Sequence, residues 1–333
     1  MKFSRTCGVA AAMLGAALAS SSAMASVNVL WNPDAAGPDP TVTVGGLDWS
    51  TGNILAVGGV NAFNAYVTSK GTVQLPIQVY AQARLANFLS PSPSSTPIGG
   101  LGLNQPGGYE YTVVAAYREV ITFAAQGGGV NVATFGYLPG GENYIKVYQD
   151  PSRNANDLAG TGFADGNLVM SGSINGMSPG AGFNAGTISP VPLDNNGTNN
   201  YPLLDTVTGQ GSTTVTADNL VVDPNYVTLP TAPLMSDFTL FTNQLLLPFQ
   251  TTDPSAQFYI GGVETPAGAG NPFDPVYGIG PINGISGPSL QIQGDASQNF
   301  DMKPIGVPEP VTASLGLLGL SALGLLASRR RTA

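Results

Sequence analysis

The stretch "TVQLPIQVYAQARL", Thr72–Leu85, carries the clearest periodicity in the chain. Its apolar residues recur at every second position: Val73, Leu75, Ile77, Val79, Ala81, Ala83 and Leu85. Because successive side chains of a strand point to opposite faces, this alternation predicts a strand with one apolar and one wet face. Pro76 has no amide hydrogen, so it further predicts that this strand lies at a sheet edge or turns its donor side outward.

Other segments repeat this pattern. In "YEYTVVAAYREVITF", Tyr109–Phe123, alternate residues again share an apolar face. Shorter strands are predicted at residues 41–44, 143–149, 167–174, 213–216, 238–249, 257–263 and 290–293, with glycine-rich turns between them. Between the two ends of the chain, no segment shows helical spacing over ten or more residues. The sequence therefore predicts an all-β, mostly antiparallel fold, a β-sandwich or a jelly roll.

The N-terminus has the features of an export signal. Lys2 and Arg5 precede an uncharged run over residues 6–19, and Ala23-Met24-Ala25 then offers small residues for cleavage. This order predicts a secretory signal peptide, with a cleaved helix, over residues 1–25. The apolar run is short and serines follow it, which disfavours a permanent anchor.

The C-terminus carries a second apolar segment. Residues 311–327 are free of charge, and as a helix they would extend about 26 Å, just enough to cross a bilayer core. Before this segment stand Pro308, Glu309 and Pro310, and after it stand Arg329, Arg330 and Arg331. Arginines at one end of a span favour the cytoplasmic side, so the preceding residues should face away from the cytoplasm. The segment is either a permanent tether or a removable signal.

This order of motif, apolar span and basic cluster resembles the PEP-CTERM sorting signal. The resemblance implies that an exosortase, in the inner membrane of a bacterium with an outer membrane, recognises the motif and removes the tail, much as the hydrophobic tail of a lipid-anchor signal is removed. The chain then divides into a signal peptide (1–25), an exported β-rich domain (26–306) and a sorting signal (307–333). The mature protein would lie at the cell surface or in the extracellular matrix, and would contact the membrane only through the transient tail.

Composition narrows the chemistry of the exported domain. The single cysteine, Cys7, lies in the signal, and the chain has no histidine, which excludes disulfides, thiolate or imidazole metal sites and histidine-dependent triads. Without signal and tail, six basic and twenty acidic residues leave a net charge of −14. Such a charge disfavours nucleic-acid partners and attracts cations. The sequence predicts no catalytic residues, no required cofactor and no enzymatic activity.

An acidic loop, "DPSRNANDLAGTGFADG" (Asp150–Gly166), is the candidate metal site. Oxygen-bearing side chains at Asp150, Asn154, Asn156 and Asp157 could surround Ca²⁺, which prefers oxygen ligands. The EF-hand positions for glycine and glutamate hold Ala155 and Thr161 instead. The favoured alternative is a turn in which these side chains bond to their own backbone.

The role of the Glu119 carboxyl group has two possible interpretations. Glu119 follows Arg118 on a predicted strand and shares a face with Tyr117 and Ile121. If buried, it would have a raised pKa and could act as an acid; if exposed or paired with a base, it would be structural, which is the favoured interpretation. Glycoside hydrolysis needs only two carboxylates, but no glutamate here lies in a recognisable catalytic motif.

Four stretches of the body raise a family resemblance: Leu47–Gly59, Val79–Leu85, Asn156–Ile174 and Leu290–Phe300. They resemble the flocculation-associated PEP-CTERM proteins, which hold bacterial cells within a polysaccharide matrix. The resemblance implies a non-enzymatic protein that promotes flocculation or biofilm cohesion with exopolysaccharide. The alternative is a calcium- or carbohydrate-binding surface module.

Overall fold

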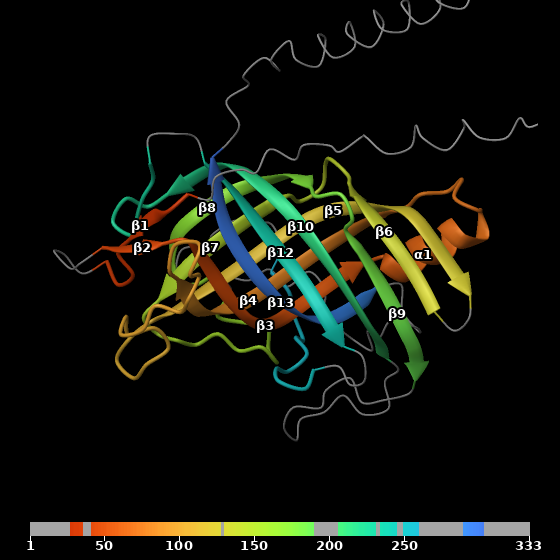
Figure 1. Ribbon diagram of the computed structural model, residues 1–333. Coiled ribbons are helices and arrows are strands. Elements are labelled where there is room, and N and C mark those ends of the chain that lie inside the picture. Colours follow the sequence, from red (N-terminus) through yellow and green to blue (C-terminus); the bar gives the residue numbers. More distant parts are fainter. Residues whose placement is uncertain are drawn as a thin grey trace, which may run out of the picture.

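The computed structural model describes residues 27–35, 41–127, 130–189, 206–230, 234–244, 249–259 and 289–302. These residues form thirteen strands and one helix, α1 (Gly59–Thr68) (Figure 1). The strands are β1 (Val29–Trp31), β2 (Val42–Val44), β3 (Gly46–Val57), β4 (Pro76–Leu89), β5 (Glu110–Gly127), β6 (Val130–Tyr137), β7 (Tyr144–Asp150), β8 (Asn167–Met177), β9 (Gly182–Ser189), β10 (Thr206–Val222), β11 (Val227–Thr228), β12 (Leu234–Gln244) and β13 (Leu290–Met302).

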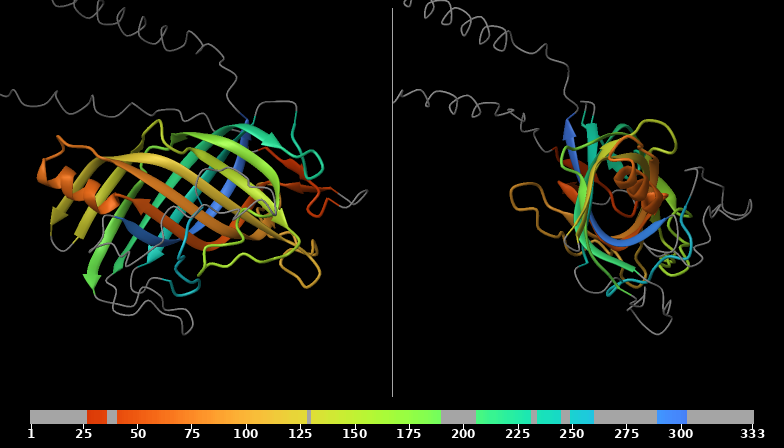
Figure 2. Two further views of the ribbon diagram at one scale, coloured as in Figure 1. Left: turned by 180° about the vertical axis from the view of Figure 1, so that it is seen from behind. Right: turned by 90° about the vertical axis from the view of Figure 1, so that its right-hand side faces the viewer.

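Ten strands form one antiparallel sheet that closes on itself. Its order is β12-β13-β3-β4-β5-β6-β9-β10-β8-β7, and β12 also pairs with β10. The long strands β5 and β10 each have three partners. Along one edge β5 pairs with β4, and along the other it pairs with β7 and then with β6. Likewise, β10 pairs with β12 along one edge and with β9 and then β8 along the other. The result is a closed cylinder of strands, with α1 at one end (Figure 2). We call it the closed sheet.

The prediction of an all-β, mostly antiparallel fold is confirmed. Ten of the strands form one continuous sheet, whose opposite walls face each other across the core, and β1, β2 and β11 form a separate three-stranded sheet. Register shifts interrupt several of its pairings, including β3 with β4 and β10 with β8. Such irregularities increase strand twist and bending, and long twisted strands tend to curl a sheet toward closure.

The inward face of β4 matches the predicted alternation. Ile77, Val79, Ala81, Ala83 and Leu85 are all buried in the core. The residues before Pro76, however, are not in the strand, and Val73 and Leu75 are exposed.

The prediction that Pro76 marks a sheet edge is wrong. The strand it begins, β4, lies between β3 and β5 inside the sheet. A proline is tolerated there because it is the first residue of the strand, so it interrupts no run of ladder hydrogen bonds.

Large aromatic side chains fill one end of the closed sheet. There β1 pairs with β2 and β11, and Trp31 of β1 is fully buried. Its ring lies against Phe88, Tyr111 and Phe300, with centroid distances of 5.6, 6.0 and 6.3 Å. These contacts make the end near β1 a densely packed core.

The helix α1, at the opposite end, was not predicted. It begins after Gly58, whose φ of 79° is costly for residues other than glycine. The Tyr66 hydroxyl, at the far end of the helix, donates a 2.8 Å hydrogen bond to the Thr122 carbonyl of β5. A ten-residue helix is marginal by itself, so docking against the closed sheet stabilises it more than local propensity does.

The outward face of β3, β4 and β5 is covered rather than wet. Leu55, Tyr80 and Ala116 pack against Phe258, from the segment 249–259. In the same wall, Gln82 donates to Ser255 Oγ at 2.8 Å, and the Ser255 amide donates to Asn53 Oδ1 at 2.8 Å. The predicted wet face of β4 is therefore wrong at Tyr80 and Gln82, because a segment distant in sequence buries it.

Gly160 tests this covering contact. Its φ is +72°, and a Cβ there would fall against the Gln257 carbonyl oxygen and 2.5 Å from Ser255 Oγ. Gly160→Ala should therefore lower the free energy of unfolding by about 1–3 kcal/mol in urea denaturation. Gly107→Ala is the control, because Gly107 also has a positive φ, +76°, but an added Cβ there has no neighbour within 4 Å. Equal stability of the two variants would contradict the covering contact.

No helix in the described part of the chain combines the length and the apolar character needed to cross a bilayer. The predicted signal helix and the predicted sorting helix lie outside the described residues and stay predictions, as do the domain boundaries.

Candidate functional site

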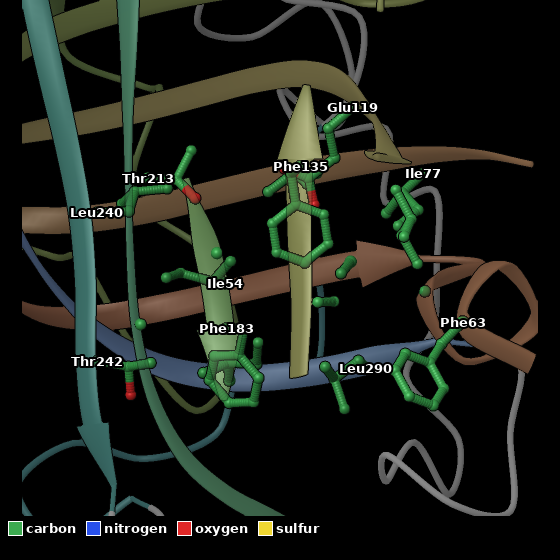
Figure 3. Close-up of a pocket in the computed structure, with 18 of the residues that line it drawn as sticks. Ile54, Phe63, Ile77, Glu119, Phe135, Phe183, Thr213, Leu240, Thr242 and Leu290 are labelled. Carbon is green, nitrogen blue, oxygen red and sulfur yellow. The ribbon is translucent and has the colours of Figure 1, made fainter. Parts of the chain in front are cut away.

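A cavity of about 290 Å³ lies inside the closed sheet at the α1 end. It is lined by α1 and by eight strands: β3, β4, β5, β6, β9, β10, β12 and β13. Figure 3 shows labelled side chains from all of these elements around this space. The labelled residues are Ile54, Phe63, Ile77, Glu119, Phe135, Phe183, Thr213, Leu240, Thr242 and Leu290.

Small residues on neighbouring strands leave this space open. The cavity is lined by the small residues Ala56, Ala133, Gly182 and Gly211, whereas the opposite end of the sheet is filled by large aromatic rings. Gly211 lies against the backbone of β9, because a Cβ there would be 2.9 Å from the Phe183 Cα. The cavity therefore depends on small residues brought together from four strands.

Glu119 faces the cavity from the inward side of β5. The predicted shared face is confirmed, since Tyr117, Glu119 and Ile121 are all buried and all line the cavity. Glu119 is only 5% exposed, and its Oε2 has no hydrogen-bond partner. Neither lysine nor arginine is found among the lining residues that the structure describes.

Burial controls the ionisation of this carboxyl group. Loss of solvent raises the pKa of Glu119 from 4.5 to about 8, because the charged form is the one that burial disfavours. The pKa of the neighbouring Tyr117 is also raised, first by its own burial and then by the Glu119 charge. Near neutral pH the cavity therefore holds a protonated acid, which can donate a hydrogen bond or give up its proton to a solvent base.

Among the residues that the structure describes, the cavity lining supplies one carboxyl group and not the pair used in glycoside hydrolysis. Glu119 is the one acidic residue among the described lining residues. The usual mechanism needs a second carboxylate at a defined separation. The arrangement is suited to binding rather than to this chemistry.

The residues of the acidic loop each have a separate partner. Asp150 Oδ1 accepts a 2.7 Å bond from the Ser152 amide, and Asn156 Oδ1 accepts a 2.9 Å bond from the Ala159 amide. These are the local turns that the alternative interpretation predicted. The alternative of side chains bonding to nearby backbone is thus confirmed at Asp150 and Asn156.

The other two predicted ligands contact side chains. Asn154 Nδ2 donates to Asp165 Oδ2 at 2.9 Å, and Asp157 forms a 2.8 Å ion pair with Arg84 of β4. The described residues contain no group of three or more acidic side chains placed to hold a metal ion. Asp150 Oδ2 is buried without a hydrogen-bond partner. The calcium site stays a prediction.

The outer wall carries a row of polar side chains that sequence reasoning missed. Cross-strand register aligns one polar residue from each of five neighbouring strands, from β10 to β4. We call this set the polar row: Thr214, Thr239, Ser297, Asp48 and Asn87. A 2.8 Å bond joins the hydroxyls of Thr214 and Thr239, and Asn87 Nδ2 donates to Asp48 Oδ2 at 2.9 Å.

A second set of polar groups extends this surface. Thr216 Oγ1 donates to Asp237 Oδ1 at 2.7 Å across β10 and β12. The pKa of Asp295, on β13, is raised by partial burial and then by the Asp48 carboxylate. Alternating Thr, Ser, Asn and Asp in these strands was the available sequence signal, but only the register shows that they line up.

The residues of the predicted sorting motif and basic cluster lie outside the described residues: Pro308, Glu309, Pro310, Arg329, Arg330 and Arg331.

No family model, no curated protein and no solved structure matches the chain.

Proposed function

We propose that this chain is an exported bacterial protein of the cell surface or extracellular matrix, which promotes flocculation or biofilm cohesion by contacting exopolysaccharide, without catalysis. The observation that carries the proposal is the order of parts at the C-terminus: a Pro-Glu-Pro motif, an uncharged span and three arginines. An exosortase would remove this tail during export. The lack of histidine and of cysteine beyond the signal supports a non-catalytic role.

The polar row supports polysaccharide as the partner. Its hydroxyl, amide and carboxyl groups can exchange hydrogen bonds with sugar hydroxyls. Neighbouring strands lie about 4.8 Å apart, so the row offers regularly spaced groups across five strands. An extended polysaccharide chain presents repeated hydroxyls that such a row could contact in succession.

Complementation of a deletion strain tests the proposal. Deletion should leave exopolysaccharide secretion intact and release the cells as planktonic growth, and the wild-type gene should restore flocs. The double variant Thr214→Val with Thr239→Val should restore them poorly, because two hydrogen bonds of about 1 kcal/mol each correspond to roughly a thirtyfold loss of affinity. The matched control is Thr122→Val with Thr134→Val, a hydroxyl pair 3.0 Å apart on β5 and β6.

Three outcomes of this experiment contradict the proposal: unchanged flocs in the deletion strain, equal rescue by both double variants, or a recovered protein whose mass still includes the arginine tail. The alternative is a calcium- or carbohydrate-binding surface module, and its calcium part rests on the partnerless Asp150 Oδ2 and the acidic charge. Calorimetry of the chain with Ca²⁺ separates it, since a protein without a calcium site shows no saturable heat.

A further inference from the structure

One carboxyl oxygen of Glu119, Oε2, is buried without a partner beside a cavity that has room for one. Buried polar groups in folded proteins nearly always have a hydrogen-bond partner, so an exception needs a physical reason. Glu119 Oε2 has none, and the cavity at its side is about 290 Å³. A ligand with a hydrogen-bond donor next to Glu119 would give Oε2 the partner that it lacks.

The remaining walls define the body of such a ligand. Aliphatic and aromatic side chains surround most of the space, among them Ile54, Ile77, Phe135, Phe183 and Leu240 (Figure 3). A dry cavity of about 150 Å³ holds a benzene molecule. This cavity, about twice as large, has room for one aromatic ring with a short chain, or for an aliphatic chain of similar volume.

The cavity reaches the surface of the described structure. Gln126 and Ser212 both line it, and both are exposed. They lie on β5 and β10, toward the end of the closed sheet that also carries α1. A ligand can therefore enter from this end without passing the aromatic core around Trp31.

The charge of the residues lining the cavity determines which polar group the ligand should carry. Glu119 is the one carboxyl group of the described lining, and no lysine or arginine there would compete for it. The whole chain carries a net charge of −9, which favours the approach of cations. We propose that the cavity binds a small apolar molecule that carries one protonated amine, with the ammonium group paired to Glu119 and the apolar body between the walls. This inference does not depend on the proposed matrix role.

Binding of such an amine is coupled to the release of a proton. Because burial raises the pKa of Glu119 to about 8, the acid is protonated at pH 7 before a ligand binds. The ammonium group favours the carboxylate, so the acid proton leaves to solvent as the ligand binds. Affinity for the amine should rise as the pH increases toward 8, a dependence that a neutral ligand would not show.

Calorimetry of the purified full chain tests the proposal. The probes are 2-phenylethylamine and 2-phenylethanol, which have similar shapes and differ in the charged head group. At pH 7 the amine should bind at least tenfold more tightly than the alcohol. Titrations in two buffers with different ionisation heats should show close to one proton released per amine bound, and none with the alcohol.

Glu119→Gln identifies the responsible group, because it keeps the shape and removes the charge. It should lower amine affinity at least tenfold, abolish proton release and change alcohol affinity less than threefold. Glu142→Gln is the matched control, since Glu142 is not among the lining residues, and it should bind both probes as the wild type does.

The position of the bound amine can be checked without a variant. In spectra of isoleucine-methyl-labelled protein, the signals of Ile54, Ile77 and Ile121 should shift, because these residues line the cavity. Ile145 and Ile174 do not line it and should stay unchanged. The proposal is overturned if the amine does not bind, if the alcohol binds equally well, if Glu119→Gln keeps the amine preference, or if the shifts fall elsewhere.

Discussion

Glu119→Gln is expected to stabilise the folded chain at pH 9 by about 5 kcal/mol, and to change its stability little at pH 4. Burial raises the pKa of Glu119 from 4.5 to about 8. Each pH unit between these values corresponds to about 1.4 kcal/mol, so above pH 8 the wild-type chain must hold an unfavourable buried carboxylate. The glutamine has no charge to bury at any pH.

The sign of the pH dependence follows from proton binding. Between pH 4.5 and 8 the folded chain keeps the Glu119 proton and the unfolded chain has lost it, so this residue makes stability fall as the pH rises. Urea denaturation at pH 4, 6, 7 and 9 measures the effect. Other buried carboxyl groups with raised pKa, such as Glu110, contribute equally to both proteins, so the difference isolates Glu119. Parallel curves for wild type and variant would contradict the assignment.

Trp31→Ala is expected to cost about 3–5 kcal/mol of unfolding free energy, as large-to-small changes of buried aromatic residues do. Trp31 is fully buried among aromatic rings, and its Nε1 donates to the Tyr111 hydroxyl at 3.1 Å. That hydroxyl in turn donates to the Pro33 carbonyl at 2.7 Å. The substitution therefore leaves a cavity and removes a donor from a buried chain of hydrogen bonds.

An exposed aromatic residue provides the control for Trp31. Phe123 on β5 is 52% exposed, and Phe123→Ala should change stability by no more than about 0.5 kcal/mol. Thermal or urea denaturation of both variants measures the difference. If the two substitutions cost the same, the aromatic cluster does not form the core of this end.

Much of the strand architecture follows from alternation alone. The pattern in residues 77–85 and 111–121 predicts both the strands and their inward faces, and it places Glu119 correctly beside Tyr117 and Ile121. Closure of the sheet does not follow, because a strand with one buried face has the same period of two in layered sheets and in a closed one. The pairing of β12 with β10, which closes it, joins strands whose register no local pattern encodes.

The features that sequence reasoning missed depend on contacts between distant residues. The wet face expected for Tyr80 and Gln82 is buried by the segment 249–259. The spacing of oxygen-bearing side chains in the acidic loop suggested shared ligands, but Asp157 pairs with Arg84, 73 residues away in sequence. The cavity arises because small residues from several strands meet at one end of the closed sheet. The burial of Glu119 alone would not predict this cavity.

Direct titration of Glu119 tests most directly whether this carboxyl group is buried inside the closed sheet with its Oε2 unpaired. The chain has five glutamates, so ¹³C labelling of their side-chain carboxyl groups gives a small set of resonances. The resonance that disappears in Glu119→Gln identifies the residue. We expect it to titrate at about pH 8. A midpoint near 4.5, the ordinary value, would show that the carboxyl group is solvated and would contradict the buried site.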